Sequence, residues 1–323
     1  MMYVDMPESE LPDYRSSQVD PTDFDDFWDA TLSTARAEAS AVRIEPVDSG
    51  LTTIDVFDVT FSGWGGQPVE AWLRMPKGAT AALPAIVEFV GYGGGRGHFL
   101  DNLLFASSGF AHFQMDTRGQ GSSWSMGDTA DADGSGGPQY PGVMTRGIES
   151  RETYYYRRLF TDAVRAVETV RELPQVDESR VSVFGISQGG GIALAVAGLV
   201  PGLAAVAPCV PFLCDFPRAT VMTDSYPYKE IRDFLAVHRH KVGTVAEVLP
   251  YFDGVNFAKR ATAPALFSAS LMDATCPPST IHGAYNVYGG ERSMSLWQFN
   301  GHEGGGVIDL QRALAFFRSV VAA

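Results

Sequence analysis

Hydrophobic positions change their spacing along the chain, and this divides it into a helical start, a hairpin and a long run of buried strands. In residues Asp20–Glu38 the large apolar side chains recur at helical spacing, with acidic residues in the first turn; they are Phe24, Phe27, Trp28 and Leu32. This pattern predicts an N-terminal helical extension.

The next two segments alternate apolar and polar residues. They are Thr53–Ser62 and Gln67–Met75, and a Gly-rich turn separates them. Alternation of this kind is typical of strands with one buried face, so the pair predicts an antiparallel hairpin.

From Pro84 onward the strand-like segments become short apolar runs without alternation: Ala85–Val90, Ala111–Met115, Arg180–Phe184, Leu203–Ala207, Pro264–Ala269 and Ser293–Phe299. Parallel strands that helices cover on both faces have this pattern. Helices are predicted between and after them, over Glu152–Leu173, Gly189–Gly198, Pro278–Tyr288 and Arg312–Val321. We therefore expect an α/β fold with about eight strands, two antiparallel and six of parallel type.

Two segments do not fit this alternation of strands and helices. Residues Ser122–Gly142 are polar and predict a long loop. Residues Phe212–Asp253 hold two or three helix-like pieces between strands, and we interpret them as a cap-like insertion. We expect residues 1–323 to form a single domain with an approximate insertion at 212–253.

The chain has a formal charge of −14, which opposes binding to nucleic-acid phosphates and to anionic lipid headgroups. Its three cysteines predict reduced thiols in a cytoplasmic protein, and the acidic N-terminus shows no signal peptide. The long uncharged stretch Gly189–Cys214 is interrupted by prolines and glycine. It therefore predicts a buried helix and strand, not a membrane span.

The strongest chemical signal is Gly185-Ile186-Ser187-Gln188-Gly189, a G-x-S-x-G motif between an apolar strand and an Ala/Leu/Val-rich helix. Small residues on both sides of the serine allow a sharp strand-to-helix turn that exposes its hydroxyl. The motif alone is also compatible with an ordinary Gly-rich loop. Its position between strand and helix predicts an α/β-hydrolase fold with Ser187 as nucleophile.

A serine nucleophile needs a histidine base, and in this fold the chain order is serine, acid, histidine. This order excludes His98 and His112. We expect the other internal histidines on the solvated surface; they are His238, His240 and His282. His302 follows the last predicted strand and begins a Gly-rich loop, so it is the predicted base.

Asp273 is the predicted orienting acid, because it is the only carboxylate in the loop after the penultimate strand. The alternative is that it caps a helix before Pro277-Pro278. Glu303, beside the predicted base, is interpreted as a helix-start or hydrogen-bonding residue.

The predicted oxyanion donors are the backbone N–H groups of Gln188 and of Tyr92, the second in the Gly-rich segment Gly91–Gly97. This segment does not satisfy G-x-G-x-x-G in any register, which argues against a dinucleotide site. No ligand cluster suggests a metal, and we expect no cofactor.

The chain resembles carbohydrate esterase family 7, the acetyl xylan esterase/cephalosporin C deacetylase group, from about residue 5 to its C-terminus. The motifs in common are Arg118-Gly119-Gln120-Gly121, Gly185-Ile186-Ser187-Gln188-Gly189 and His302-Glu303, in the family's order. Similar segments are DFDDFW, TFSGWGGQPVEAW, MTRGIESRETYYYRRLFTDAVRAVE and DATCPPSTIHGAYN.

The resemblance implies a Ser187, Asp273 and His302 triad with Tyr92 and Gln188 as oxyanion donors. It also implies cytoplasmic, ring-shaped homohexamers whose active sites face an inner cavity. Such enzymes deacetylate short acetylated xylo-oligosaccharides and cephalosporin C. We interpret Arg118 as a buried support of the nucleophile region. The alternatives are a general short-chain carboxylesterase or peptidase on the same fold, and a catalytically inactive binding protein.

Overall fold

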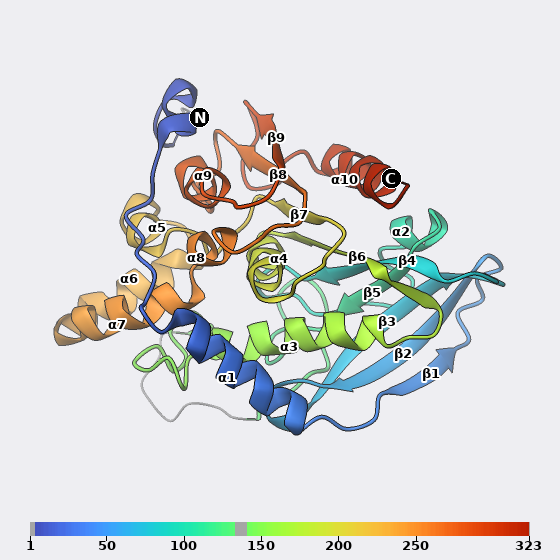
Figure 1. Cartoon of the computed structure of the whole chain (residues 1–323). Helices are drawn as coiled ribbons and strands as arrows, with labels where there is room; N and C mark the ends of the chain where they lie inside the picture. The colour runs from blue at the N-terminus through green and yellow to red at the C-terminus, as the bar shows by residue number, and fades with distance from the viewer. Residues whose placement is uncertain (1–3, 133–140, 323) are drawn as a thin grey trace.

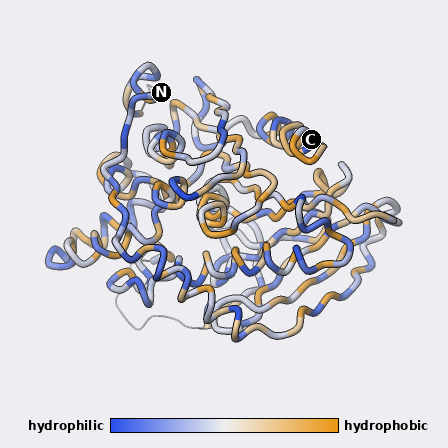
Figure 2. The backbone as a smooth tube through the Cα atoms, viewed as in Figure 1, coloured by the Kyte–Doolittle hydropathy of each residue, from blue (hydrophilic) through white to orange (hydrophobic). Residues whose placement is uncertain are grey.

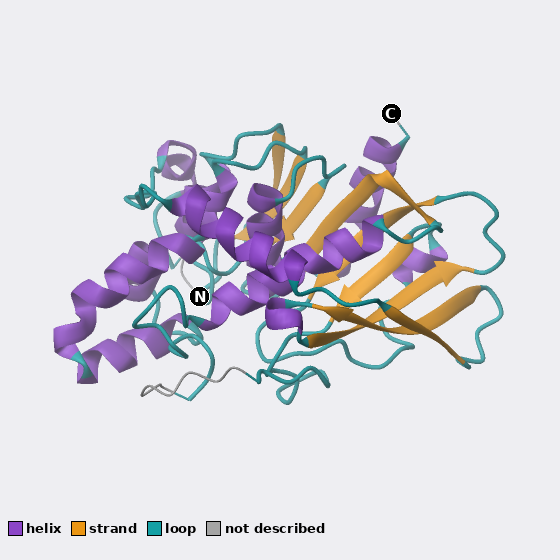
Figure 3. Cartoon of the chain, turned by 60° about the horizontal axis from the view of Figure 1, so that its bottom comes forward, coloured by secondary structure: helices purple, strands orange, loops and turns teal. Residues whose placement is uncertain are grey.

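The structure is a computed structural model, and it describes residues 4–132 and 141–322. Within these residues nine strands form one twisted sheet (Figures 1 and 3). In sheet order they are β1 (Arg43–Val47), β2 (Ile54–Ser62), β3 (Pro68–Pro76), β5 (Ala111–Met115), β4 (Leu83–Phe89), β6 (Val176–Ile186), β7 (Val206–Cys209), β8 (Ala265–Ser270) and β9 (Arg292–Trp297).

The sheet changes from antiparallel to parallel along its width. Strands β1, β2 and β3 pair antiparallel, and β3 also pairs antiparallel with β5. From β5 across to β9 every pair is parallel. The predicted hairpin and the six parallel-type strands are thus confirmed, within a few residues at their ends.

Strand β1 was not predicted. Four of its five residues are exposed, and it pairs along one edge of the sheet, Arg43 opposite Thr60 and Val47 opposite Val56. An exposed edge strand needs no buried face, so it lacks the hydrophobic alternation from which the other strands were predicted.

Both faces of the inner parallel strands, from β5 across to β8, are mostly buried, which explains their continuous apolar sequences, whereas the edge strand β9 has one buried residue. On β6, Val183 belongs to the core under α3 and α4, whereas its neighbour Phe184 belongs to the core on the opposite face. That second core also contains Phe105 and Phe317 from α2 and α10. Since successive side chains of a strand point to opposite faces, a strand covered twice has no polar side.

The helices that flank the sheet are α1 (Phe24–Ala37), α2 (Leu104–Ser107), α3 (Tyr155–Arg171), α4 (Gln188–Leu199), α9 (Pro278–Tyr285) and α10 (Val307–Val321), and a 3-10 turn η1 (Glu8–Asp13) precedes them. The predicted helices are confirmed, although α10 begins five residues earlier than expected. Figure 2 shows α4 at the centre of the molecule as a mostly hydrophobic tube.

Between β7 and β8 the chain leaves the sheet and forms a group of short helices. They are α5 (Phe216–Met222), α6 (Tyr228–Val237), η3 (Arg239–Lys241), α7 (Val242–Val248), η4 (Leu249–Phe252) and α8 (Gly254–Ala258). Figure 1 shows α6 and α7 side by side, projecting away from the sheet. This group coincides with the segment interpreted as a cap-like insertion, and we call it the insertion below.

His282 was expected at the surface, but it lies buried in α9; the helix packs against β8 and η1, so the burial of its position depends on tertiary contacts. In the predicted loop Ser122–Gly142, residues 122–132 contain neither helix nor strand, and residues 133–140 lie outside the described residues. Among the helices that the structure describes, none is long and apolar enough to cross a membrane.

Candidate active site

Ser187 occupies the sharp turn between β6 and α4. Its backbone has φ 57° and ψ −118°, a conformation that residues with a side chain rarely adopt. The two motif glycines explain how this turn is possible. A Cβ atom on Gly185 would lie 2.2 Å from the backbone of Gly189, and one on Gly189 would lie 2.0 Å from the carbonyl oxygen of Phe89. The motif is therefore a steric requirement of the turn.

The structure brings the three predicted triad residues together from three separate loops. Nε2 of His302, after β9, lies 2.9 Å from the Ser187 hydroxyl oxygen. Nδ1 of the same ring lies 2.8 Å from Oδ2 of Asp273, after β8. This is the spacing that a serine, a base and an orienting acid need for proton transfer.

The carboxylate of Asp273 is fully buried, and its second oxygen is also engaged. Oδ1 accepts backbone N–H bonds from Thr275 and Cys276, at 2.8 and 2.9 Å. These bonds leave Oδ2 free to face His302. Asp273, Cys276 and His302 are the one group of possible metal ligands found among the described residues, and two of its three members already form the Ser187–His302–Asp273 chain.

The predicted oxyanion donors flank Ser187. Gln188 is the first residue of α4, and Tyr92 lies in the loop after β4 that lines the same cavity as Ser187 and His302. Gln120 connects the two segments, because its side chain accepts an N–H bond from Gly93 at 2.6 Å and donates to the side chain of Gln188 at 3.0 Å. One amide side chain thus links the residue after Tyr92 to the side chain of Gln188.

The triad opens into a cavity of about 450 Å³. Its walls come from the Tyr92 loop, the nucleophile turn, the loop after β8 and the insertion, and the lining residues are Gly91, Tyr92, Trp124, Ile186, Ser187, Tyr226, Pro227, Thr275 and His302. Two aromatic side chains that line it are strongly exposed, Trp124 at 64% and Tyr226 at 48%. The cavity therefore combines the Ser187 hydroxyl with exposed aromatic surface.

Comparison with known proteins shows the family of the chain. A family model described as acetyl xylan esterase (AXE1) matches residues 1–320. The chain belongs to this family. The match confirms the resemblance noted from the sequence and places the chain among carboxylic-ester hydrolases.

Two solved structures are similar to this chain over almost its whole length. Acetyl xylan esterase from Paenibacillus sp. R4 is 37% identical with a TM-score of 0.93, covering 98% of this chain and 100% of that one. Acetyl xylan esterase 1 from Thermoanaerobacterium sp. JW/SL YS485 is 32% identical with a TM-score of 0.89, covering 97% and 99%. Among curated proteins, acetyl esterase Axe7A of Xylanibacter ruminicola is 29% identical over 289 residues, 87% of this chain. The chain spans 63% of the length of Axe7A.

Arg118 of this esterase is fully buried behind the site. Its guanidinium binds Asp162 of α3 through two nitrogens, at 2.5 and 2.8 Å, and donates to Gln67. Its carbonyl oxygen accepts the hydroxyl of Tyr155. These contacts fit the expected buried support, since they tie the loop that carries Gln120 to α3.

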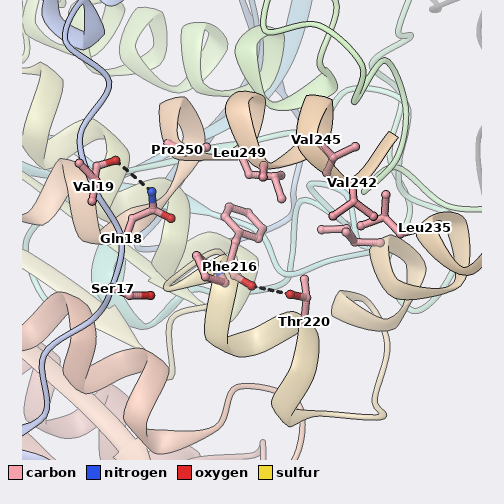
Figure 4. A pocket seen from close by; sticks show the side chains of 13 residues that line it. Ser17, Gln18, Val19, Phe216, Thr220, Leu235, Val242, Val245, Leu249 and Pro250 are labelled. Carbon is pink, nitrogen blue, oxygen red and sulfur yellow. Dashed lines mark hydrogen bonds between the residues drawn. The ribbon is translucent and has the colours of Figure 1, made fainter. Parts of the chain in front are cut away.

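A second cavity, of about 360 Å³, lies between the N-terminal segment and the insertion (Figure 4). Figure 4 shows the ring of Phe216 near its centre, with Leu235, Val245 and Leu249 around it. It contains neither a nucleophile paired with a base nor a charged side chain. Among the described residues, the predicted nucleophile and base thus line the cavity at Ser187 and not this one.

Sequence reasoning did not identify three residues that shape the site: Gln120, Trp124 and Glu230. Gln120 was quoted within a motif but received no role, and Trp124 lay in a segment interpreted as a plain loop. Glu230 is on α6, more than forty residues after Ser187 in the sequence, and reaches Tyr92 only in the folded chain. A charged residue on a helix of mixed polarity carries no signal that it will be buried.

Proposed function

We propose that this protein is a serine acetyl esterase that deacetylates small acetylated carbohydrates, such as acetylated xylo-oligosaccharides, and cephalosporin C. The observation that carries the proposal is the continuous Ser187–His302–Asp273 hydrogen-bond chain in an open cavity. Membership of the acetyl xylan esterase family supports the acetyl ester as the bond that is cleaved.

In the proposed reaction, the Ser187 oxygen attacks the acetyl carbonyl carbon while Nε2 of His302 takes the hydroxyl proton. The negative charge on the carbonyl oxygen is stabilised by the N–H groups of Gln188 and Tyr92. When the ester bond breaks, His302 returns the proton to the leaving sugar oxygen. A water molecule then attacks the acetyl-enzyme, with His302 as base, and acetate leaves.

Asp273 acts through His302. Its carboxylate accepts a hydrogen bond from the Nδ1–H group of the ring. This leaves Nε2 unprotonated and directed at Ser187. The same carboxylate stabilises the imidazolium that forms when the serine proton is taken. Its own position is set by the two backbone N–H groups at Oδ1.

The cavity lining supports a carbohydrate as the alcohol part of the ester. Exposed aromatic rings such as Trp124 and Tyr226 offer flat apolar surfaces with a polar edge, to which the carbon–hydrogen faces of a sugar ring can bind. The net charge of −14 favours a neutral or cationic substrate. A location in the cytoplasm and assembly into a homohexamer remain part of this proposal, based on the family resemblance; light scattering at several protein concentrations measures the assembly.

We expect the enzyme to prefer acetyl over longer acyl esters and to act slowly on polymeric xylan. We expect Tyr92 and Pro227, which line the same cavity as Ser187, to crowd the space for the acyl group. Each methylene that fits an apolar pocket adds about 0.8 kcal/mol of binding free energy. A kcat/KM that falls from acetate to butyrate therefore requires a steric barrier. The measurement compares p-nitrophenyl acetate, butyrate and octanoate.

The polymer part is tested separately, by acetate release from acetylated xylo-oligosaccharides and from acetylated xylan at equal acetyl concentration. Octanoate turnover equal to or faster than acetate turnover would make the protein a general carboxylesterase. Rapid deacetylation of the polymer would contradict active sites that face an enclosed cavity.

A further inference from the structure

A carboxylate from the insertion reaches into the predicted oxyanion loop. Glu230, in the first turn of α6, is only 3% exposed. Its Oε1 accepts the hydroxyl of Tyr92 at 2.7 Å, and its Oε2 accepts the backbone N–H of Met144 at 3.1 Å. Within residues 4–132 and 141–322, no lysine, arginine or histidine forms an ion pair with it. A buried carboxylate without a cation is costly, which calls for a functional reason.

Three segments that are distant in sequence meet at this carboxylate: the Tyr92 loop, residues 142–144 and α6. The backbone N–H of Val143 donates to the Tyr92 hydroxyl at 2.7 Å, so this hydroxyl both accepts and donates. Gly142 has φ 129°, and a Cβ there would lie 2.3 Å from both carboxylate oxygens of Glu230. The chain therefore closes tightly around the Tyr92–Glu230 pair.

The backbone of Tyr92 is held from two further sides. Its carbonyl oxygen accepts the indole N–H of Trp124 at 2.8 Å. The N–H of the next residue, Gly93, donates to Gln120. These bonds restrain the main chain, whereas the Glu230 bond restrains the far end of the side chain. Together they determine where the Tyr92 N–H lies relative to Ser187.

We infer that Glu230 is a positioning residue: through the hydroxyl of Tyr92 it holds the oxyanion loop in the arrangement that the attack by Ser187 requires. The insertion thereby contributes to catalysis as well as to the cavity wall. This inference rests on the proposed serine mechanism, because it assigns the Tyr92 N–H to the developing oxyanion.

The charge of Glu230 supplies an independent readout. Burial raises its pKa from 4.5 to about 7, against the hydrogen bonds from Tyr92 and Met144. The titratable groups that face it are Tyr92, Tyr154 and Tyr156, and burial raises the pKa of each phenol above its ordinary value. These phenols stay neutral near pH 7. Protonation of Glu230 is therefore the change of charge that we expect at this place near neutral pH.

The raised pKa of Glu230 affects activity and folding stability in opposite directions. Above about pH 7 the carboxylate accepts both donors, which favours activity, and below it the added proton competes with the Tyr92 hydroxyl. Folding stability behaves in reverse. A group whose pKa is raised in the folded state stabilises the fold below its unfolded pKa, and this contribution is lost as pH rises through the folded value. At pH 8, Glu230→Gln should therefore keep the thermal stability while losing activity.

The test measures kcat and KM for p-nitrophenyl acetate at pH 8 in Glu230→Gln, Tyr92→Phe and the double variant. Tyr92→Phe keeps the backbone N–H and removes only the anchoring hydroxyl. Loss of an oxyanion donor costs about 10²- to 10³-fold, so a displaced donor should cost about tenfold in kcat, with KM within about twofold. Both substitutions break the same contact, so their effects should not add. The kcat of the double variant should therefore lie within about twofold of that of the slower single variant.

Tyr14→Phe is the matched control. The Tyr14 hydroxyl donates to a carboxylate oxygen of Asp215 at 2.6 Å, a similar bond between the N-terminal segment and the insertion, away from the oxyanion loop. It should leave kcat unchanged. In the pH profile, the ratio of wild-type kcat to Glu230→Gln kcat should fall from about tenfold at pH 8 toward one below pH 7, because only the wild type can gain a proton at this position.

A kcat within twofold of wild type in Tyr92→Phe, or a ratio of wild-type kcat to Glu230→Gln kcat that does not change with pH, would overturn the inference. If Glu230→Gln does not fold, Tyr92→Phe alone decides it. The proposed mechanism is tested separately: a Ser187→Ala variant that retains activity refutes both, whereas an inactive Ser187→Ala with an unaffected Tyr92→Phe refutes only the role of Glu230.

Discussion

Ser187→Ala should lower kcat for p-nitrophenyl acetate by about 10⁵- to 10⁶-fold while the protein stays folded. The substitution removes the hydroxyl oxygen that lies 2.9 Å from Nε2 of His302, so no acetyl-enzyme can form. Alanine has the same Cβ as serine and fits the turn at φ 57°, which the flanking glycines already accommodate. The residual rate should exceed that of water by about 10³-fold, because the oxyanion donors and the cavity remain.

Ser182→Ala is the matched control, since this serine lies on the same strand, is buried, and its hydroxyl has no hydrogen-bond partner among the described residues. It should retain wild-type kcat and thermal stability. The measurements are steady-state kinetics and mass spectrometry of the enzyme trapped with a fluorophosphonate, which should label wild type and Ser182→Ala only. More than a few per cent of wild-type activity in Ser187→Ala would refute the nucleophile.

Asp273→Asn should lower kcat by about 10³- to 10⁴-fold without unfolding the protein. The asparagine oxygen can still accept the N–H groups of Thr275 and Cys276. This places its NH₂ group against Nδ1 of His302, at the position where the wild-type carboxylate accepts a hydrogen bond. The ring then carries its proton on Nε2 and cannot take the proton of Ser187.

Glu303→Gln is the control for this prediction, because Glu303 is the carboxylate next to His302 in sequence. Its Oε1 accepts from Asn300 and from the backbone of Gly301, and it forms no bond to the imidazole among the described contacts. Its kcat should stay within about threefold of wild type. A nearly silent Asp273→Asn together with an inactive Glu303→Gln would transfer the orienting role to Glu303.

The sequence predicted the sheet well where burial is complete. The runs around Phe113, Val183 and Phe267 are apolar because helices cover both faces of their strands, so the strands were recognisable without any long-range information. Strand β1 was missed because an exposed edge strand needs no apolar residues. The burial of His282 was missed for the same kind of reason: contacts with β8 and η1, distant in sequence, create it.

For the candidate site, the sequence by itself determined the residues whose roles depend on local geometry and chain order. Ser187 is recognisable from the two glycines that its turn needs, and Asp273 and His302 from their positions after successive strands. The first relation is local in sequence, and the second follows from the fixed order of parallel strands. Both can therefore be recognised from the sequence.

Only the tertiary structure decided what surrounds the triad. Gln120 meets Gly93 and Gln188, and Glu230 meets Tyr92 across 138 positions of sequence, because loops from different strand ends and the insertion converge at one edge of the sheet. A hydrogen bond between distant polar side chains has no period and no spacing rule. Such contacts arise from how helices and loops pack, and that packing is set by the whole hydrophobic core rather than by any one segment.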